Sequence, residues 1–434
     1  MSTIRRMLPA RLLAAGIATT LLLTAPALLA APGDPLGPAF TVDAGDIGES
    51  FGDPVIARDA AGNFVAAWTW QGRDSDNRFY SEVRVRRHYA DGTPQGPAQT
   101  ISPADHRPQA PAVSMNAAGD YVVTWRSPDP ARGARIHARS FDTSGAARSP
   151  LLDVARLGQG IGYHSVTMNA AGSFVVTWNN FTLAGLVPTG NGGSLYAGTS
   201  TVHARRFELD GASNGSILVS TSVTNPTPLF GTNGTAPPVA AVDAQGNFVV
   251  AWEDNTALLR PVIHARRFRH DGLGIGLKVR VNPLTQANAS WPSIGMDAAG
   301  NYAIGWATPH QTGPNSYSGH DLHFRRYSSA GIAQGDPVQV GDRLSLEARS
   351  SLAMAPEGHF AIAWVGTPSA ACCTPKQILL QHYSAAGTPQ GSVVVVADDI
   401  ATNESPTAGI DGYGNVAVIW KELQQLKARL YQGF

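Results

Sequence analysis

The 434-residue sequence is poor in cysteine and in charged residues. Its two cysteines are adjacent, at Cys372 and Cys373, so the fold cannot rest on a framework of several disulfides. Only 15% of the residues are charged, and 32 basic side chains balance 32 acidic ones. This balance favours neither nucleic acid nor an anionic membrane as a partner. Beyond the N-terminal region, no stretch approaches the roughly 20 consecutive apolar residues of a membrane helix, so we expect no membrane insertion.

The long apolar run of the sequence stands at its N-terminus. Three arginines precede the run Leu12 to Leu23, and a small-x-small cleavage signal follows at Ala25-Pro26-Ala27. This pattern predicts a secretory signal peptide over residues 1–31, with cleavage near residues 27–31. We expect residues 32–434 to form a single domain that is secreted or periplasmic.

One motif recurs along the rest of the chain. A glycine precedes a tryptophan by six residues seven times, and seven of the nine tryptophans are used in this way. The seven pairs are Gly62/Trp68, Gly119/Trp125, Gly172/Trp178, Gly246/Trp252, Gly300/Trp306, Gly358/Trp364 and Gly414/Trp420. Asn or Asp stands three residues before the glycine in six repeats, and Ala355 stands there in the sixth. This spacing predicts a tight turn in which the glycine adopts the left-handed conformation.

Each repeat predicts four strands. After the turn comes a stretch such as Phe248-Val249-Val250-Ala251-Trp252, whose apolar side chains point alternately to both faces of a sheet. A strand that is apolar on both faces is buried between sheets stacked face to face. A third strand follows, as in Ile263-His264-Ala265-Arg266-Arg267-Phe268, and a fourth leads to the next repeat.

The two ends of the chain share one repeat. Gly33 to Val42 resembles the fourth strand at Gly92 to Ile101, whereas the last predicted strand, which ends at Tyr431, is a third strand. One unit must therefore be assembled from both termini, which closes a ring and removes exposed sheet edges. We predict an all-β fold, a seven-bladed β-propeller of four-stranded blades whose last blade is closed by the N-terminal strand. The positions five residues before each glycine are all small, as crowding around an axis requires: Ala57, Ser114, Thr167, Ala241, Gly295, Ala353 and Gly409.

These repeats resemble those of secreted bacterial proteins built from D-x-x-G-N-[FY]-V-V-x-W and A-R-R-F-x-x-x-G motifs. The resemblance covers residues 33 to 434 and implies a β-propeller. It implies no activity, and no catalytic residue can be transferred from these relatives.

The loops of such blades divide between two faces. Turns between strands one and two and between strands three and four share one face, and they are uniformly tight here. Loops between strands two and three and between blades share the other face, and their lengths vary. We expect binding residues on this variable face, because length variation belongs where loops are free of structural duty. Its largest insertions, Asn179 to Ser200 and Ala212 to Ala236, predict either a rim or partial lid or a flexible decoration.

Histidines and arginines recur in the third strands. A zinc ion needs ligands about 2.0 Å away, and third strands of different blades diverge, so we interpret these histidines as scaffold. They are His137, His203, His264 and His323. We expect each recurring arginine to pair with a turn carboxylate or carbonyl, or to stack on an aromatic ring between blades. These arginines are Arg87, Arg139, Arg205, Arg266, Arg325 and Arg429.

Residues that break the repeat are the better ligand candidates. Aromatic rings beside Asp, Asn and Arg are typical of sugar-binding surfaces, although any loop-rich surface contains them. The candidates for ligand contact are Trp70, Asp74, Asp76, Tyr80, Tyr163, His164, Trp291 and Tyr317. Asp74 and Asp76 are also weak candidates for calcium, because their run lacks the full spacing of an EF-hand loop. We expect no other metal and no cofactor.

The adjacent pair Cys372 and Cys373 lies in a loop on the variable face. An exported protein favours oxidation, but neighbouring Cα atoms are about 3.8 Å apart, whereas ordinary disulfides span roughly 4.4 to 6.8 Å. We hypothesise a strained vicinal disulfide that forms a rigid apolar surface against a ligand. Free thiols and an intermolecular bridge are the alternatives.

The sequence leaves three functions open. We predict an exported recognition module, a monomer, whose variable face binds carbohydrate or another extracellular polymer, with an extracellular protein as a further candidate partner. The first alternative is a hydrolase or lyase acting on polysaccharide, with Glu253, Asp254, His310 and Asp321 as candidate catalytic residues. It would need convergent carboxylates, or a histidine with an acidic partner, at the mouth of the channel. The second alternative is a purely structural surface protein.

Overall fold

A computed structural model describes most of the chain after residue 30. The described residues are 31–46, 48–73, 76–103, 107–129, 133–157, 162–188, 194–222, 227–228, 236–254, 261–286, 288–313, 316–344, 349–366, 376–400 and 405–433. Residues 1–30 of the predicted signal peptide and the Cys372–Cys373 pair lie outside them.

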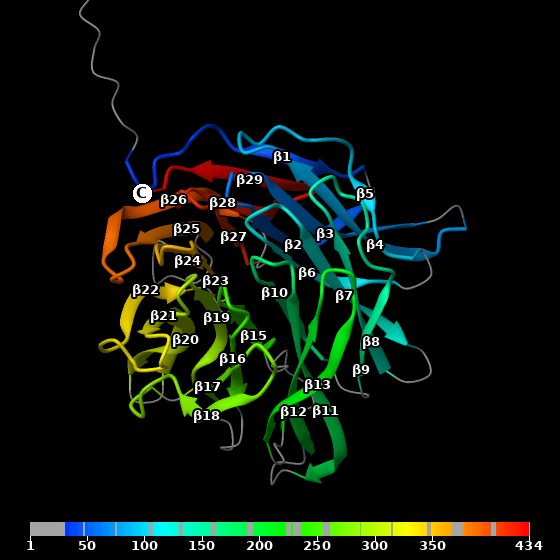
Figure 1. Ribbon diagram of the computed structural model, residues 1–434. Helices are drawn as coiled ribbons and strands as arrows, with labels where there is room; N and C mark the ends of the chain where they lie inside the picture. Colours follow the sequence, from blue (N-terminus) through cyan, green and yellow to red (C-terminus); the bar gives the residue numbers. More distant parts are fainter. Residues whose placement is uncertain are drawn as a thin grey trace, which may run out of the picture. The chain divides into compact units, whose positions relative to one another are not determined.

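The described chain forms seven four-stranded antiparallel blades and contains no helix. Figure 1 shows the blades following one another around the fold, from the blue strands near the N-terminus to the red strands near the C-terminus. The prediction of an all-β, seven-bladed β-propeller is confirmed. Within the described residues, there is no helix long and apolar enough to span a membrane.

The first four blades occupy the N-terminal two thirds of the chain. Blade 1 consists of β2 (Ser50–Arg58), β3 (Phe64–Arg73), β4 (Phe79–His88) and β5 (Gln99–Thr100). Blade 2 consists of β6 (Gln109–Met115), β7 (Tyr121–Asp129), β8 (Gly133–Phe141) and β9 (Leu152–Leu157). Blade 3 consists of β10 (His164–Met168), β11 (Phe174–Pro188), β12 (Ser194–Phe207), β13 (Ser213–Ser222) and the short β14 (Thr227–Pro228). Blade 4 consists of β15 (Val239–Val242), β16 (Phe248–Asp254), β17 (Val262–Phe268) and β18 (Gly274–Arg280).

The last three blades complete the fold. Blade 5 consists of β19 (Ser290–Met296), β20 (Tyr302–Gly313), β21 (Ser316–Tyr327) and β22 (Val338–Leu344). Blade 6 consists of β23 (Ser350–Met354), β24 (Phe360–Gly366), β25 (Lys376–Tyr383) and β26 (Pro389–Ile400). Blade 7 consists of β27 (Thr407–Ile410), β28 (Val416–Glu422), β29 (Gln425–Tyr431) and β1 (Phe40–Ala44).

Two relationships close the ring. The first strand of each blade contacts the first strand of the next, and the series returns from β27 to β2. In blade 7 the N-terminal strand β1 pairs with the C-terminal strand β29, with Phe40 opposite Ala428. Figure 1 shows these two strands together. The predicted closure of the last blade by the N-terminal strand is therefore confirmed.

The core explains why the tryptophans recur. The described residues contain seven hydrophobic clusters, and each cluster lies between two neighbouring blades and holds one repeat tryptophan. None of the seven tryptophans is more than 5% exposed. A buried tryptophan removes roughly 150–250 Å² from water, so each blade interface depends strongly on this one side chain.

The turns between strands one and two follow the sequence motif. Asp243 accepts hydrogen bonds from the backbone nitrogens of Gln245 (2.9 Å) and Asn247 (2.8 Å), and Gly246 has a φ of 85°. All seven turn glycines have positive φ, as the spacing predicted. These turns are also bonded to one another: the Ala60 nitrogen donates to the Ala117 carbonyl at 3.2 Å in the next blade.

The third-strand histidines and arginines are part of the blades. Each of the four histidines packs on the tryptophan of its own blade, as in the pair Trp178 and His203, whose ring centroids are 5.4 Å apart. Several arginines donate to the carbonyl of the preceding blade, such as Arg205 to Val154 at 3.0 Å. Their stacking differs from the expectation, because the ring belongs to the same strand, two residues further on.

Blade 1 requires a correction to the predicted alignment of its arginines. His88 lies opposite Phe64 and takes the aromatic position, so Arg86, and not Arg87, is equivalent to the recurring arginine. Accordingly Arg86 donates to the carbonyl of Val42 in the preceding blade, whereas Arg87 reaches the carbonyl of Thr143 in the next blade.

The two predicted insertions differ in structure. In blade 3, β11 and β12 continue as a paired hairpin out to Pro188 opposite Ser194, which Figure 1 shows as a long green ladder. The segment Ala212 to Ala236 is not only an insertion, because it contains β13, the fourth strand of blade 3.

Candidate functional site

A cavity of about 570 Å³ opens where the first strands of the blades begin. Its lining includes residues from all seven blades, so it is the mouth of the central channel. The loops that enter the first strands lie on the variable face. The cavity therefore lies on the face where the sequence placed ligand binding.

One repeat position supplies a side chain from every blade to this cavity. It stands nine residues before the turn glycine, and we call these seven residues the mouth ring. In blade order they are Asp53, Ala110, Tyr163, Pro237, Trp291, Arg349 and Ser405. The residue type is different in every blade, although the glycine and tryptophan that follow are the same in all seven.

Three members of the mouth ring have an unusual backbone. Asp53, Ala110 and Trp291 have φ values of 50°, 50° and 53°, and each directly precedes a proline. The pairing of the first and second strands shifts at each of these places, so the strand begins with a β-bulge. Non-glycine residues rarely adopt this region, at a cost of roughly 1–3 kcal/mol. Bulges commonly re-aim side chains near functional sites.

The two aromatic members of the mouth ring are both half-buried. Trp291 contacts the ring of His320 edge-on, with centroids 5.3 Å apart. Tyr163 is positioned through its backbone: its nitrogen donates to Oδ1 of the buried Asn179 at 2.7 Å, and its carbonyl accepts from the Asn179 nitrogen at 3.2 Å. The cavity thus presents two rings, one from blade 3 and one from blade 5.

Arg126 and His164 lie together on the blade 2 and blade 3 side of the cavity. Arg126 donates to the carbonyl of Gly162 at 3.4 Å. Burial lowers the pKa of His164 to about 4, the charge of Arg126 lowers it further, and a hydrogen bond with the Thr124 backbone opposes both. His164 is therefore neutral at pH 7.

Several polar atoms of the cavity lining are buried without a hydrogen-bond partner among the described residues: Arg126 Nε, His164 Nε2 and Ser405 Oγ. An unsatisfied buried polar atom costs about 1–3 kcal/mol. Atoms of this kind also occur outside the cavity, as at Trp68 Nε1 and Arg266 Nε, so they do not by themselves mark a ligand site.

The charged side chains of the cavity are not paired with each other. Asp53 and Arg349 are exposed, and neither forms an ion pair within the described part of the chain. Arg126 also has no carboxylate partner among those residues. The lining therefore carries two cationic groups and one carboxylate, all available to a ligand.

The structure brings three of the predicted ligand residues together in the cavity: Tyr163, His164 and Trp291. Trp70 and Tyr80 lie elsewhere, in blade 1, with ring centroids 5.2 Å apart. Trp70 is 5% exposed, and Arg84 covers its ring at 3.9 Å.

The other candidates are Asp74, Asp76 and Tyr317, and of these Asp76 is not among the described residues of the lining. Asp76 forms an exposed ion pair with Arg78 at 3.2 Å, and Asp74 lies outside the described residues. Tyr317 lies in β21, opposite Gln311. Within the described residues, no group of three or more His, Cys, Asp or Glu side chains is placed to hold a metal ion. The calcium hypothesis at Asp74 and Asp76 stays a prediction.

Two of the candidate catalytic residues end β16. Asp254 is 1% exposed and accepts hydrogen bonds from His264 at 2.9 Å and Lys278 at 2.7 Å. Burial raises its pKa, but these hydrogen bonds outweigh burial and hold the pKa well below its usual value. Glu253 is half-buried beside it. Neither residue lines the cavity.

The other two candidates form a pair in blade 5. His310 Nδ1 lies 2.8 Å from Asp321 Oδ1, and their side chains are 24% and 18% exposed. Asp321 directly follows His320, which contacts Trp291 of the mouth ring. The pair is a histidine with an acidic partner, and it is next in the chain to His320, which contacts a lining residue. Neither His310 nor Asp321 is among the described residues of the lining.

Sequence reasoning missed the three charged residues of the described lining, Asp53, Arg126 and Arg349, and the mouth-ring hydroxyl of Ser405. Three of them occupy the mouth-ring position. A comparison of all seven repeats shows that this position varies, but the position directly before it varies too, so the signal is weak. Arg126 follows a repeat tryptophan directly, and no signal in the repeat distinguishes it.

The fold and this cavity define the protein as a seven-bladed β-propeller with a polar and aromatic cavity at one mouth of its channel. No protein-family model and no curated protein matches the chain. A crystal structure of a protein of unknown function from Dyadobacter fermentans is similar, with a TM-score of 0.51, 11% identity, and coverage of 91% of this chain and 99% of that chain.

Two further solved structures are similar at lower TM-scores. A Penicillium chrysogenum alpha-L-arabinanase, complexed with arabinobiose, has a TM-score of 0.48 and 14% identity, and covers 76% of this chain and 95% of its own. An ulvan lyase of family PL25 has a TM-score of 0.48 and 11% identity, and covers 89% of this chain and 94% of its own. At such identities the likeness extends to the fold alone.

Proposed function

We propose that this protein is an exported recognition module that binds carbohydrate at the mouth ring. The observation that carries the proposal is the mouth ring itself, one repeat position that lines one cavity and differs in every blade. A position needed only for packing would repeat its residue, as the turn glycines and core tryptophans do. A different side chain from each blade can present a different group to each part of a bound ligand.

The chemistry of the ring suits a sugar. The half-buried faces of Tyr163 and Trp291 can stack on the CH groups of a sugar ring. The carboxylate, guanidinium and hydroxyl groups of Asp53, Arg349 and Ser405 can bond its hydroxyls. A cavity of about 570 Å³ falls within the roughly 300–1,000 Å³ of small-molecule sites, so a short saccharide segment fits it.

Export and oligomeric state belong to the same proposal. The arginines, apolar run and cleavage signal at the N-terminus support secretion or residence in the periplasm. We propose a monomer, with extracellular protein as the competing class of partner.

A glycan-array screen of the purified protein tests the proposal. We expect specific saccharide binding that falls at least about tenfold in Trp291→Ala and in Tyr163→Ala, because stacking contacts of this kind contribute roughly 0.5–1.5 kcal/mol each beyond the buried area. Tyr413→Ala is the matched control. Tyr413 is an exposed aromatic residue, 71% accessible, in a turn between strands one and two on the opposite face.

Three results would decide against this proposal. They are a blank array, saccharide binding that Trp291→Ala leaves unchanged, and an equal loss of binding in Tyr413→Ala. A blank array together with capture of an extracellular protein would favour the structural or protein-binding alternatives.

A second candidate function, a hydrolase or lyase acting on polysaccharide, is favoured by the His310–Asp321 pair. A histidine oriented by a carboxylate at 2.8 Å is an arrangement that serves as a general base. The test is release of new reducing ends, or of unsaturated products that absorb near-ultraviolet light, from the polysaccharide bound on the array. Activity in the unaltered protein, lost in both His310→Ala and Asp321→Asn while binding persists, would establish catalysis. Binding without turnover would leave the recognition module as the function.

A further inference from the structure

We infer that the saccharide bound at the mouth ring is anionic and carries carboxylate or sulfate groups. This inference rests on the proposed function and narrows its ligand class. It is carried by two arginines that lack a carboxylate partner among the described residues and line the same cavity, Arg126 and Arg349.

Arg126 is the stronger of the two observations. It is half-buried, and its Nε is buried without a partner among the described residues. Within the same residues its Nη1 donates a long hydrogen bond to the Gly162 carbonyl. Some half-buried arginines of the described chain contact carboxylates, as Arg135 contacts Asp129 and Asp153, whereas others, such as Arg205, bond to a hydroxyl and a backbone carbonyl. An arginine that is partly desolvated and uncompensated is poised to bind an anion, and its planar guanidinium fits carboxylate and sulfate oxygens.

His164 adds to this environment. It lies beside Arg126 in the cavity lining and is neutral at pH 7, so the positive charge on this side of the cavity is that of Arg126. Its Nε2 has no partner among the described residues. A ligand hydroxyl next to the anionic group can donate to this nitrogen.

The order of the blades arranges these groups along an arc. Arg126 belongs to blade 2, Tyr163 to blade 3, Trp291 to blade 5 and Arg349 to blade 6. The two aromatic rings therefore lie between the two arginines. A saccharide stacked across the rings would bring its ends toward blades 2 and 6, where an arginine stands at each end.

Asp53 limits where the anionic groups can lie. It is the one acidic side chain of the described lining and belongs to blade 1, on the shorter arc between the two arginines. Its carboxylate repels an anionic ligand from that side and so favours the arc that carries the aromatic rings. Repulsion of this kind contributes to specificity as much as attraction does.

The overall charge of the protein does not account for such binding. The chain has 32 basic and 32 acidic residues, so no general attraction to polyanions is expected. Binding of an anionic saccharide would have to come from the local arrangement of charges at the channel mouth.

Matched saccharides test the inference with the purified full-length protein. The charged probe is oligogalacturonate and its neutral partner is the fully methyl-esterified form, which keeps the sugar rings and removes the charge. Dextran sulfate and dextran form the second pair and distinguish sulfate from carboxylate as the recognised group. Affinity is measured by isothermal titration calorimetry at low and high salt.

We expect one charged probe to bind at least about tenfold more tightly than its neutral partner, with an affinity that falls as salt rises. Arg126→Gln and Arg349→Gln should each weaken binding of that probe about tenfold, as expected for loss of a hydrogen bond to a charged group. Asp53→Asn should strengthen it two- to threefold. Each arginine substitution should weaken binding of the charged probe more than binding of its neutral partner, because only the charged probe offers the guanidinium an anionic group.

The outcomes separate this inference from the proposed function. Equal affinity for charged and neutral partners, or binding unchanged in both arginine variants, would overturn the inference and leave saccharide recognition standing. No binding of either charged probe would also overturn it. If no saccharide, charged or neutral, bound in a manner sensitive to Trp291→Ala, the proposed function itself would fail.

Discussion

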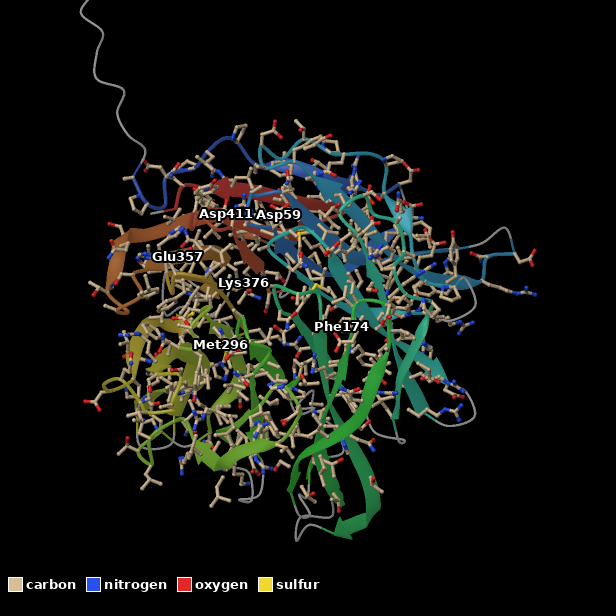
Figure 2. The ribbon with its side chains drawn as sticks, viewed as in Figure 1. Asp59, Phe174, Met296, Glu357, Lys376 and Asp411 are labelled. Carbon is tan, nitrogen blue, oxygen red and sulfur yellow. The ribbon has the colours of Figure 1, made fainter. Side chains whose placement is uncertain are left out.

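Arg58 and Asp411 form a buried ion pair where the first and last blades meet. The Arg58 Nη2 lies 3.2 Å from Asp411 Oδ2, and the two side chains are 1% and 2% exposed. Arg58 also donates to the carbonyls of Gly62 and Asn415. Figure 2 labels Asp411 beside Asp59, whose charge also acts on Arg58. The equivalent position in the other blades is apolar: Met115, Met168, Val242, Met296, Met354 and Ile410.

The first prediction concerns this pair. Arg58→Met introduces the residue that blades 2, 3, 5 and 6 already carry, but it leaves the Asp411 carboxylate buried without its cation. We expect the free energy of unfolding to fall by about 3–5 kcal/mol, as when one partner of a buried pair is removed. Chemical denaturation monitored by tryptophan fluorescence measures the loss.

The double variant Arg58→Met/Asp411→Asn is its control. It removes both charges and keeps the amide that the equivalent turns of blades 2 and 3 use, so most of the lost stability should return. Equal stability of the single and double variants would show that the ion pair does not hold the two blades together.

The second prediction concerns acid stability through His88. This residue is 1% exposed and stacks on Phe64, with centroids 4.6 Å apart and rings 5° from parallel. Burial, with help from the charge of Arg86, lowers its pKa to about 4. A histidine with a lowered pKa contributes full stability above its unfolded pKa of about 6.5, and this stability is lost as the pH falls from 6.5 toward 4.

We therefore expect His88→Phe to be at least as stable as the unaltered protein at pH 7 and about 2 kcal/mol more stable at pH 5. Phenylalanine occupies the equivalent position at Phe141 and Phe268. The acid sensitivity should shrink without vanishing, because burial also lowers the pKa of His164 and of His382 to about 4. Thermal melts of both proteins at pH 7 and pH 5 measure this difference. An equal change in melting temperature at the two pH values would contradict the prediction.

The third prediction concerns the one turn without a capping side chain. Ala355 stands where four other blades have an aspartate that accepts backbone hydrogen bonds, as Asp297 does from the Asn301 nitrogen at 2.8 Å. The backbone turn at Ala355 is formed nevertheless. The double substitution Ala355→Asp/His359→Asn should raise the free energy of unfolding by about 1 kcal/mol, the net value of such hydrogen bonds. Asp297→Ala should lower the free energy of unfolding by a similar amount. A loss of stability in the Ala355 double variant, or a gain in Asp297→Ala, would refute this account of the turn.

The fourth prediction concerns crowding around the channel. A Cβ added at Gly295 would lie 2.6 Å from Leu352 Cδ2 and 2.7 Å from Met354 Cβ, both in the next blade. Gly295→Ala should therefore cost about 1–3 kcal/mol through overpacking. Gly96→Ala is the control, because a Cβ at Gly96 meets nothing within 4 Å. Equal effects of the two substitutions would mean that the first strands are not tightly packed.

The fold could be predicted from the repeat, because every blade has the same packing and turn requirements. A tryptophan must fill each blade interface and a glycine must close each turn, so both recur and reveal the period. The shared blade was predictable for the same reason, since the segment before Val42 is a fourth strand without a third strand before it.

The candidate site was less predictable. Tyr163, His164 and Trp291 stood out as departures from the repeat, and they do line one cavity. In the sequence, Asp53 and Arg349 look like ordinary loop residues. They reach the channel mouth only because the seven blades close into a propeller. The positive φ at Trp291 depends on how the strand enters the blade, which is a tertiary constraint. Trp70 was predicted to contact a ligand because of its residue type alone. In the structure its ring is buried beneath Arg84.

The pairing of β1 with β29 has a consequence for how the chain reaches its final state. Phe40 meets Ala428, so the contact that completes the circle joins residues from opposite ends of the polypeptide. The entropy cost of closing so large a loop must be met before this contact contributes stability. During synthesis the N-terminal strand therefore has no β29 to pair with until the last strand has been made. A ribosome that stalls before β29 leaves β1 as an unpaired edge, open to the strands of another chain.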